Sequence, residues 1–267
     1  MQEEVRKYYN QHSNEEDRRL DAHPFELPVT MNFIKKYLSP GEHLFDVACG
    51  TGRFAQHLLD KGYFIGLNDL SDKNIETAKK RLNSHRNLLF IDRADALEST
   101  RWESKMWGGI LILGPLYHIR SKEKRLKLLS LAQKHLKPGG LVFSAFMSRT
   151  GALVYGLKHN PEGILYPDGV KKLWETGADE RFVENTKHFA HAYFSHPEEI
   201  NPLIRDAGLE PLHLAGAEGP FGERFELYHS LDEKLKKQWM DFVIEHCEDP
   251  RMVQQSKHLL SVARKPE

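Results

Sequence analysis

The segment from Leu44 to Gly52, Leu-Phe-Asp-Val-Ala-Cys-Gly-Thr-Gly, constrains the fold of this chain more than any other stretch. An apolar run leads into a glycine-rich turn, which predicts a buried strand, a tight turn and then a helix. Glycines allow positive φ angles and close approach of the backbone to a ligand. A helix that begins there directs its unpaired N–H groups toward the same place. Asp46 lies inside the predicted strand, where a carboxylate is costly unless it has a partner.

Residues 43–147 alternate short apolar runs with amphipathic stretches, which predicts a mostly parallel β-sheet with helices on both faces. Ser71 is the expected cap of a helix over 72–83. Residues 137–140, Lys-Pro-Gly-Gly, are expected to terminate a helix over 122–136. The expected strands are His43–Val47, Tyr63–Leu67, Leu88–Ile91, Gly109–Leu113, Leu141–Met147 and, at the end of the chain, His258–Arg264.

The remaining segments are less regular. Residues 148–195 show no clean strand period, whereas a helix–strand pair is expected at 197–217, in which Pro202 either begins or kinks the helix. An amphipathic helix is expected over 231–246. We therefore predict one domain with its core at about 41–147, 196–219 and 257–265. A mainly helical cap, from 1–40, 148–195 and 220–256, would cover the carboxyl ends of the strands, where open α/β sheets bind ligands.

Composition excludes several classes of protein. The 38 Lys and Arg residues balance 38 Asp and Glu residues, which argues against a nucleic-acid or anionic-membrane partner. The longest apolar run, 109–116, is too short to cross a bilayer. The first residues form no apolar signal core. Of the two cysteines, Cys49 lies in the glycine turn and Cys247 is distant, so we expect no disulfide and a cytoplasmic location.

The glycine turn alone fits two kinds of ligand. Gly50-x-Gly52-x-x-Ala55 matches the dinucleotide fingerprint, and Asp69 follows about 20 residues later, where an acid would hold a ribose. On this basis the chain would be an NAD(P)-dependent oxidoreductase. Such a fold has no need of Asp46, because its turn already binds the pyrophosphate.

The same turn resembles the first motif of class I S-adenosylmethionine (SAM) dependent methyltransferases, Asp/Glu-x-Gly-x-Gly-x-Gly, with Ala48 in place of the first glycine. Residues 66–71, Gly-Leu-Asn-Asp-Leu-Ser, resemble the end of the family's second strand with one extra residue. Residues 92–96, Asp-Arg-Ala-Asp-Ala, resemble its adenine-reading segment. Residues 113–118, Leu-Gly-Pro-Leu-Tyr-His, and 136–140, Leu-Lys-Pro-Gly-Gly, resemble a bacterial small-molecule group within it.

This resemblance implies a Rossmann-like, seven-stranded, mostly parallel sheet of order 3-2-1-4-5-7-6 whose last strand is antiparallel. It also implies SAM as cofactor, with Asp46 near the cationic groups of SAM. Asp69, or its neighbour Asn68, would accept hydrogen bonds from the ribose hydroxyls, and Asp95 with the N–H of Ala96 would bind adenine. The residues expected to contact the cofactor are Tyr9, Asp46, Ala48, Cys49, Gly50, Gly52, Asn68, Asp69, Leu70, Asp95, Ala96, Leu113 and Gly114.

Methyl transfer is an in-line displacement in which the protein aligns donor and acceptor. An amine acceptor needs only to be neutral and positioned, whereas a hydroxyl usually needs a base. His118 is the candidate base, because imidazole titrates near neutrality; the alternative is that it shapes its loop. Tyr117 is a second catalytic candidate or a pocket wall. Tyr9 offers an aromatic face to a sulfonium. Arg19 would either meet the methionine carboxylate of SAM or, as we favour, face solvent.

Fifteen histidines invite a metal hypothesis, and His188, His191 and His196 lie close together in the sequence. No His-Glu-x-x-His or Cys-x-x-Cys spacing accompanies them, so no bound metal is expected. The sequence thus predicts a SAM-dependent methyltransferase acting on N or O of a small molecule. The alternatives are the oxidoreductase and a SAM-binding regulator without catalysis; an RNA or protein methyltransferase is disfavoured.

Overall fold

The computed structural model describes residues 2–178 and 192–267. The strands are β1 His43–Val47, β2 Phe64–Asp69, β3 Leu88–Arg93, β4 Trp107–Ile112, β5 Leu136–Met147, β6 Glu210–Gly216 and β7 His258–Arg264. The helices are α1 Gln2–Ala22, α2 Glu26–Tyr37, α3 Arg53–Asp60, α4 Asp72–Leu82, α5 Lys122–His135, α6 Arg149–His159, α7 Pro167–Thr176, α8 Pro197–Asp206, α9 Phe225–His229, α10 Glu233–His246 and α11 Pro250–Gln255. Short 3-10 helices are η1 Thr100–Ser104, η2 Leu116–His118, η3 Pro161–Leu165 and η4 Gly219–Phe221.

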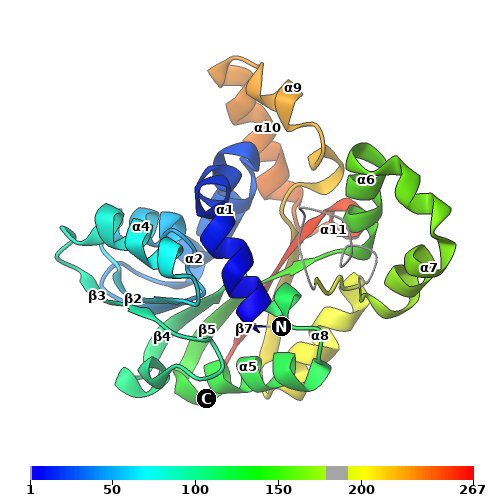
Figure 1. Cartoon of the computed structure of the whole chain (residues 1–267). Helices are drawn as coiled ribbons and strands as arrows, with labels where there is room; N and C mark the ends of the chain where they lie inside the picture. Colours follow the sequence, from blue (N-terminus) through cyan, green and yellow to red (C-terminus); the bar gives the residue numbers. More distant parts are fainter. Residues whose placement is uncertain (1, 179–191) are drawn as a thin grey trace.

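The strands form one seven-stranded sheet in the order β3-β2-β1-β4-β5-β7-β6 (Figure 1). The first five strands in this order, from β3 to β5, run parallel to one another, and β7 is antiparallel to both β5 and β6. The predicted fold class and strand order are therefore confirmed. In this order β1 lies between β2 and β4, so the loops that follow these three strands emerge side by side at one edge.

Apolar side chains cover both faces of the sheet. On β1, Leu44 packs in a layer with helices α2, α3 and α4, whereas Phe45 and Val47 pack in a second layer with α5 and α8. Successive strand residues point to opposite faces, which places the two layers on opposite sides. Phe45 stacks on Trp107 of β4 at a centroid distance of 5.1 Å. This double burial explains why the strands are continuous apolar runs rather than alternating ones.

Two local features differ in detail from the expectation. The helix before residues 137–140 ends at His135, close to the expected position, but β5 begins at Leu136 rather than at Leu141. Residues 137–140 belong to β5, since Gly139 N–H donates to Lys265 O and Lys265 N–H donates to Gly140 O. Helix α8 begins at Pro197 and contains Pro202, so this proline does not start the helix. It only removes the N–H that would reach the carbonyl four residues earlier. In both places tertiary contacts override the local signal.

Several helices cross in front of the sheet or project away from it (Figure 1). Helix α1, in blue, crosses in front of the sheet, while α9 and α10 project at the top of the view and α6 and α7 at its right side. In the described residues, no helix combines the length and apolar character that a bilayer span requires.

The turn after β1 is held in an uncommon backbone conformation. Ala48, Gly50 and Gly52 have φ angles of 61°, 57° and 79°. Ala48 is the only non-glycine residue with positive φ in the described part of the chain. A Cβ on Gly52 would lie 2.8 Å from Cδ1 of Leu82, so α4 packs directly against this turn. Ala48 thus adopts a left-handed conformation that favours glycine, at a cost in backbone strain.

We predict that Ala48→Gly stabilises the protein by about 1 kcal/mol, because glycine adopts positive φ without a Cβ penalty, less its greater unfolded-state freedom. The free energy of unfolding in urea measures the effect. Ala55→Gly, inside α3, is the matched control and should destabilise the protein by about 1 kcal/mol or more. A loss of stability in Ala48→Gly would contradict the strain assigned to this turn.

Candidate active site

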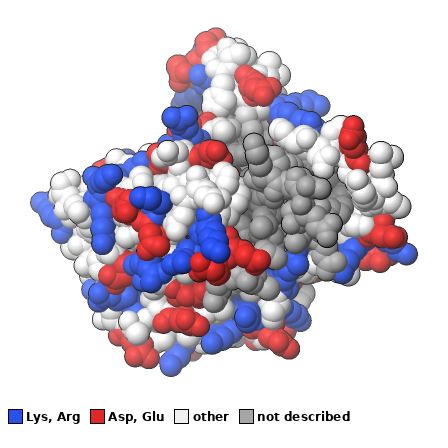
Figure 2. Space-filling model, in the orientation of Figure 1, with Lys and Arg blue, Asp and Glu red and all other residues white. Residues whose placement is uncertain are grey.

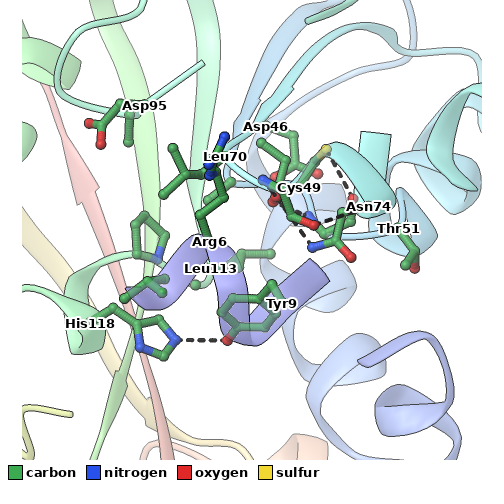
Figure 3. Close-up of a pocket in the computed structure, with 18 of the residues that line it drawn as sticks. Arg6, Tyr9, Asp46, Cys49, Thr51, Leu70, Asn74, Asp95, Leu113 and His118 are labelled. Carbon is green, nitrogen blue, oxygen red and sulfur yellow. Dashed lines mark hydrogen bonds between the residues drawn. The ribbon is translucent and has the colours of Figure 1, made fainter. Parts of the chain in front are cut away.

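A cavity of about 370 Å³ opens at the carboxyl ends of β1, β2 and β4 (Figure 3). Its walls come from α1, the turn after β1, the end of β2 and the loops after β3 and β4. Asp46, Asp69 and Asp95 all line it, so three acids far apart in the sequence share one hollow. The volume falls in the range of small-molecule sites.

Most residues that the sequence singles out for the site lie in this cavity. The lining includes Tyr9, Asp46, Ala48, Cys49, Gly50, Asp69, Leu70, Asp95, Ala96, Leu113, Gly114, Tyr117 and His118. Gly52 and Asn68 do not line it. Gly52 caps α3 behind the turn, and Asn68 is fully buried, with its Oδ1 accepting from Ala48 N–H at 3.2 Å. Of the two neighbours left open by the sequence, Asp69 therefore faces the cavity and Asn68 supports the turn.

The Asp69 carboxylate joins the first two loops of the site. Its Oδ2 accepts from Gly50 N–H at 2.9 Å. Its Oδ1 accepts from Ser71 N–H at 2.8 Å and from the Asn74 amide at 3.3 Å. Since β1 and β2 are parallel neighbours, one side chain at the end of β2 can reach both turns. These bonds fix the orientation of the carboxylate at the cavity wall.

Asp46 is electrostatically different from Asp69. Its side chain is 2% exposed, and Oδ2 is buried without a hydrogen-bond partner among the described residues. Burial, reinforced by the nearby Asp69 carboxylate, raises the pKa of Asp46 to about 7. A buried carboxylate of this kind gains most from a cationic partner. Burial and the two acids also raise the pKa of the Cys49 thiol, which keeps it protonated.

The loop after β3 brings Asp95 to the opposite wall. Its Oδ1 accepts from Leu97 N–H at 2.7 Å, and the Ala96 carbonyl accepts from the Trp102 indole at 2.8 Å. Trp102 is buried in the core, so the loop is tied to the body of the domain. Asp95 and Ala96 are thereby presented to the cavity on a fixed backbone.

The loop after β4 forms the other end of the cavity. His118, at the end of η2, is 9% exposed, and its Nε2 is 2.7 Å from the hydroxyl of Tyr9 on α1 (Figure 3). The Tyr117 hydroxyl donates to Leu113 O at 3.4 Å. Tyr117 and His118 thus both line the cavity, and His118 is joined to the N-terminal helix.

Polar contacts hold α1 over the site. Asn10 Oδ1 accepts from the Ser71 hydroxyl at 2.7 Å. Asp17 Oδ1 accepts from the Thr51 hydroxyl at 2.6 Å and from Arg81 at 2.7 Å. Arg19, expected to face solvent, instead lines the cavity and donates to both oxygens of Glu26, at 2.7 and 2.8 Å. That expectation is wrong because Glu26, on α2, gives the guanidinium a partner away from solvent.

Sequence reasoning did not find several lining residues. They are Val5, Arg6, Leu20, Thr51, Arg53, Phe54, Ser71, Asn74, Ala94, Leu97, Pro115, Ile119 and Lys124. Phe54 and Asn74 lie in the first turn of the helix that follows each of the two motif loops. This position in the sequence could have predicted that they line the cavity. The α1 residues carry none, because that helix has a weak apolar stripe and no motif.

The histidine group considered for a metal is only partly described. His188 and His191 lie outside the described residues, and His196 precedes α8 with its ring 5.1 Å from that of Trp174. Elsewhere, within residues 2–178 and 192–267, His23, Glu26 and His258 place ligand-type atoms within 4.8 Å of one another. Glu26 there is already paired with Arg19.

Comparison with known proteins agrees with this geometry. The family described as "Methyltransferase domain" matches residues 44–140, the part that carries the turn and the loops after β2, β3 and β4. The chain therefore contains a SAM-dependent methyltransferase domain of class I. YqeM of Bacillus subtilis is 24% identical to the methyltransferase over 205 residues, covering 70% of this chain and 80% of its own length.

Two further proteins are similar to the methyltransferase over most of their length. The ubiquinone biosynthesis O-methyltransferase of Coxiella burnetii is 23% identical over 203 residues, with 75% of this chain and 78% of that protein covered. A solved SAM-dependent methyltransferase from Thermotoga maritima has a TM-score of 0.60 and 18% identity, covering 97% of this chain and 99% of that one. At such identity the structural likeness concerns the fold.

We predict that Asp46→Asn stabilises the ligand-free methyltransferase at pH 8 by about 1 to 4 kcal/mol. The folded-state pKa of about 7 exceeds the ordinary value of 3.8, so between about pH 4 and pH 7 the folded protein binds more protons than the unfolded chain. The free energy of unfolding therefore falls as pH rises through this window, and asparagine removes that loss.

Urea unfolding at pH 5 and pH 8 tests this prediction. The gain in the free energy of unfolding from Asp46→Asn should be smaller at pH 5 than at pH 8. Asp168→Asn, at an exposed position on α7, is the matched control and should show no such pH dependence. An equal gain in the free energy of unfolding at both pH values would contradict the raised pKa of Asp46 as its cause.

Proposed function

We propose that this methyltransferase moves the methyl group of SAM to N or O of a small molecule bound beside His118. The observation that carries the proposal is the convergence of Asp46, Asp69 and Asp95 on one cavity. SAM combines an ammonium, a ribose and an adenine, and each has a natural carboxylate partner. We assign Asp46 to the ammonium, Asp69 to the ribose hydroxyls and Asp95 with Ala96 to adenine.

The residues present fit this cofactor. The buried, unpartnered Oδ2 of Asp46 provides an acceptor that an ammonium would satisfy. The donors around Asp69 hold its carboxylate in one orientation, as recognition of two adjacent hydroxyls requires. We assign the remaining predicted contacts, including Cys49, Leu70, Leu113 and Gly114, to the walls around the bound cofactor.

The same contacts argue against a dinucleotide. The Gly50 N–H, which a pyrophosphate would need, already donates to Asp69 at 2.9 Å. Two carboxylates beside the turn, Asp46 and Asp69, would also repel the phosphate charges. The oxidoreductase alternative therefore has less support than methyl transfer.

When bound, SAM supplies an electrophilic methyl group on a sulfonium. The chain positions the acceptor and excludes water, for which apolar lining residues such as Pro115 and Ile119 are suited. His118 is our candidate for accepting the acceptor's proton, and Tyr117 for the pocket wall. We also propose that α1, with the segments 148–195 and 220–256, caps the site; residues 179–191 of that cap lie outside the described part.

The charge distribution favours a small-molecule substrate. On the face drawn in Figure 2, Lys and Arg side chains are interspersed with Asp and Glu, without a continuous basic surface. Nucleic-acid binding usually requires such a surface. This supports a metabolite over RNA as substrate.

The decisive test is methyl transfer itself. Purified protein is incubated with [methyl-³H]SAM and a metabolite extract, and labelled products are identified by mass spectrometry. A labelled small molecule is expected. Tight SAM binding without any labelled product would favour the non-catalytic regulator, and label in RNA or protein alone would contradict the small-molecule assignment.

We predict that Asp69→Ala weakens SAM binding by about 1–3 kcal/mol, because charge-assisted hydrogen bonds to the ribose are lost. Isothermal titration calorimetry measures the affinity. Asp60→Ala, at the end of α3 and outside the cavity lining, is the matched control and should bind SAM as the natural chain does. Unchanged affinity in Asp69→Ala would refute the ribose assignment.

A further inference from the structure

The hydrogen bond between Tyr9 and His118 joins residues 109 positions apart across the cavity. The Tyr9 hydroxyl lies 2.7 Å from Nε2 of His118, and both side chains line the cavity (Figure 3). Their rings meet edge to face at a centroid distance of 5.4 Å. No sequence motif pairs these two residues, so the contact is a product of the fold.

Both partners are held in place by their own surroundings. The backbone N–H of His118 donates to the Pro115 carbonyl at 3.0 Å, and the centroid of the His118 ring lies 4.9 Å from that of Tyr117. Tyr9 precedes Asn10, whose side chain is bonded to Ser71 at 2.7 Å. The hydrogen bond is thus made between two anchored elements, η2 and α1, rather than between mobile side chains.

This contact constrains how His118 can act as a base. In the tautomer of His118 that carries its proton on Nδ1, Nε2 accepts from the Tyr9 hydroxyl. An imidazole nitrogen has one in-plane lone pair, so this Nε2 cannot accept directly from a substrate at the same time. A proton that reaches Nε2 must then pass through the tyrosine oxygen. Of the two side chains, the Tyr9 hydroxyl is then the group that can accept a hydrogen bond from the substrate.

We propose that Tyr9 and His118 form a proton relay and that the acceptor of the methyl group is a hydroxyl. As the O–CH₃ bond forms and the S–CH₃ bond breaks, the substrate hydroxyl proton moves to Tyr9 Oη. The Tyr9 proton moves in the same step to Nε2 of His118. Tyrosine ends neutral, imidazole becomes imidazolium, and the positive charge lost at sulfur reappears on His118.

The relay also determines the substrate class. A neutral amine attacks through its lone pair before it loses a proton, so it gains little from a base. A hydroxyl becomes a good nucleophile only as its proton leaves. A built proton-accepting pair in the cavity therefore favours an alcohol or phenol acceptor. This inference rests on the proposed methyl-transfer function.

The first test needs no substrate. In protein labelled with ¹⁵N-histidine, the Nε2 signal of His118 is identified by its loss in His118→Gln and is recorded at pH 9, where an imidazole is neutral. A nitrogen that accepts a hydrogen bond resonates upfield of a free one. Tyr9→Phe should move this signal downfield, with and without SAM. An unchanged signal would overturn the pairing.

The second test uses the tritiated SAM assay with the metabolite extract. Tyr9→Phe keeps the aromatic ring and should lower kcat by about 100-fold while leaving the SAM affinity unchanged. His118→Gln should lower kcat to a similar extent, and the double variant should be no slower than the slower single variant. Tyr8→Phe, one position away on α1 and outside the cavity lining, is the matched control and should retain full kcat.

The outcomes separate the two proposals. Absence of label with every variant contradicts the proposed function. Label with an unchanged kcat in Tyr9→Phe contradicts the relay alone. A labelled N-methyl product overturns the hydroxyl assignment, whereas an O-methyl product with additive losses in the double variant overturns the relay.

Discussion

The Asp69 carboxylate is the contact on which the organisation of the site depends. One side chain at the end of β2 accepts from Gly50 in the turn after β1 and from Ser71 and Asn74 at the start of α4. Two loops that would otherwise move independently become one wall. The same bonds occupy the amide that a phosphate would need. Burial, reinforced by the nearby Asp69 carboxylate, raises the pKa of Asp46 to about 7. The backbone geometry of the turn and its ligand preference therefore depend on Asp69, whereas the protonation of Asp46 follows mainly from its burial.

The sheet makes this arrangement possible. Because β1 is covered by apolar layers on both faces, polar groups are concentrated at the carboxyl edge of the sheet. Asp46 is the exception, since its carboxylate is already buried inside the strand. Such a group is tolerated where function gives it a partner, which is consistent with a cationic ligand at this edge.

Helix α1 is held in place by polar contacts, in contrast to the apolar packing of the sheet. It is held over the cavity by hydrogen bonds that Asn10 and Asp17 accept, from the hydroxyls of Ser71 and Thr51, rather than by a wide apolar stripe. Such bonds require a specific geometry, whereas each adds only about 1 kcal/mol to stability. Its placement brings Tyr9 to His118 and so completes the acceptor end of the cavity.

The sequence alone located the strands, because a run such as Leu88–Ile91 is continuously apolar and is flanked by polar residues typical of turns. The family resemblance added their order. It also determined that Asp46, Asp69 and Asp95 follow or occupy strand ends, since that is a matter of spacing. Only the tertiary structure decided that Asp69 rather than Asn68 faces the cavity, because the side chains of neighbouring strand residues point to opposite faces and one residue of register reverses them.

The tertiary structure likewise decided that residues 137–140 belong to β5, since their partner Lys265 is distant in the chain. Arg19 turns to Glu26, seven residues later, because the connection from α1 to α2 brings the two side chains together. The contact between Tyr9 and His118, like that to Lys265, joins residues distant in the chain. Local spacing encodes which residues form a strand or a turn, whereas a hydrogen bond between a helix at one end of the chain and a loop after β4 exists only once the sheet has brought them together.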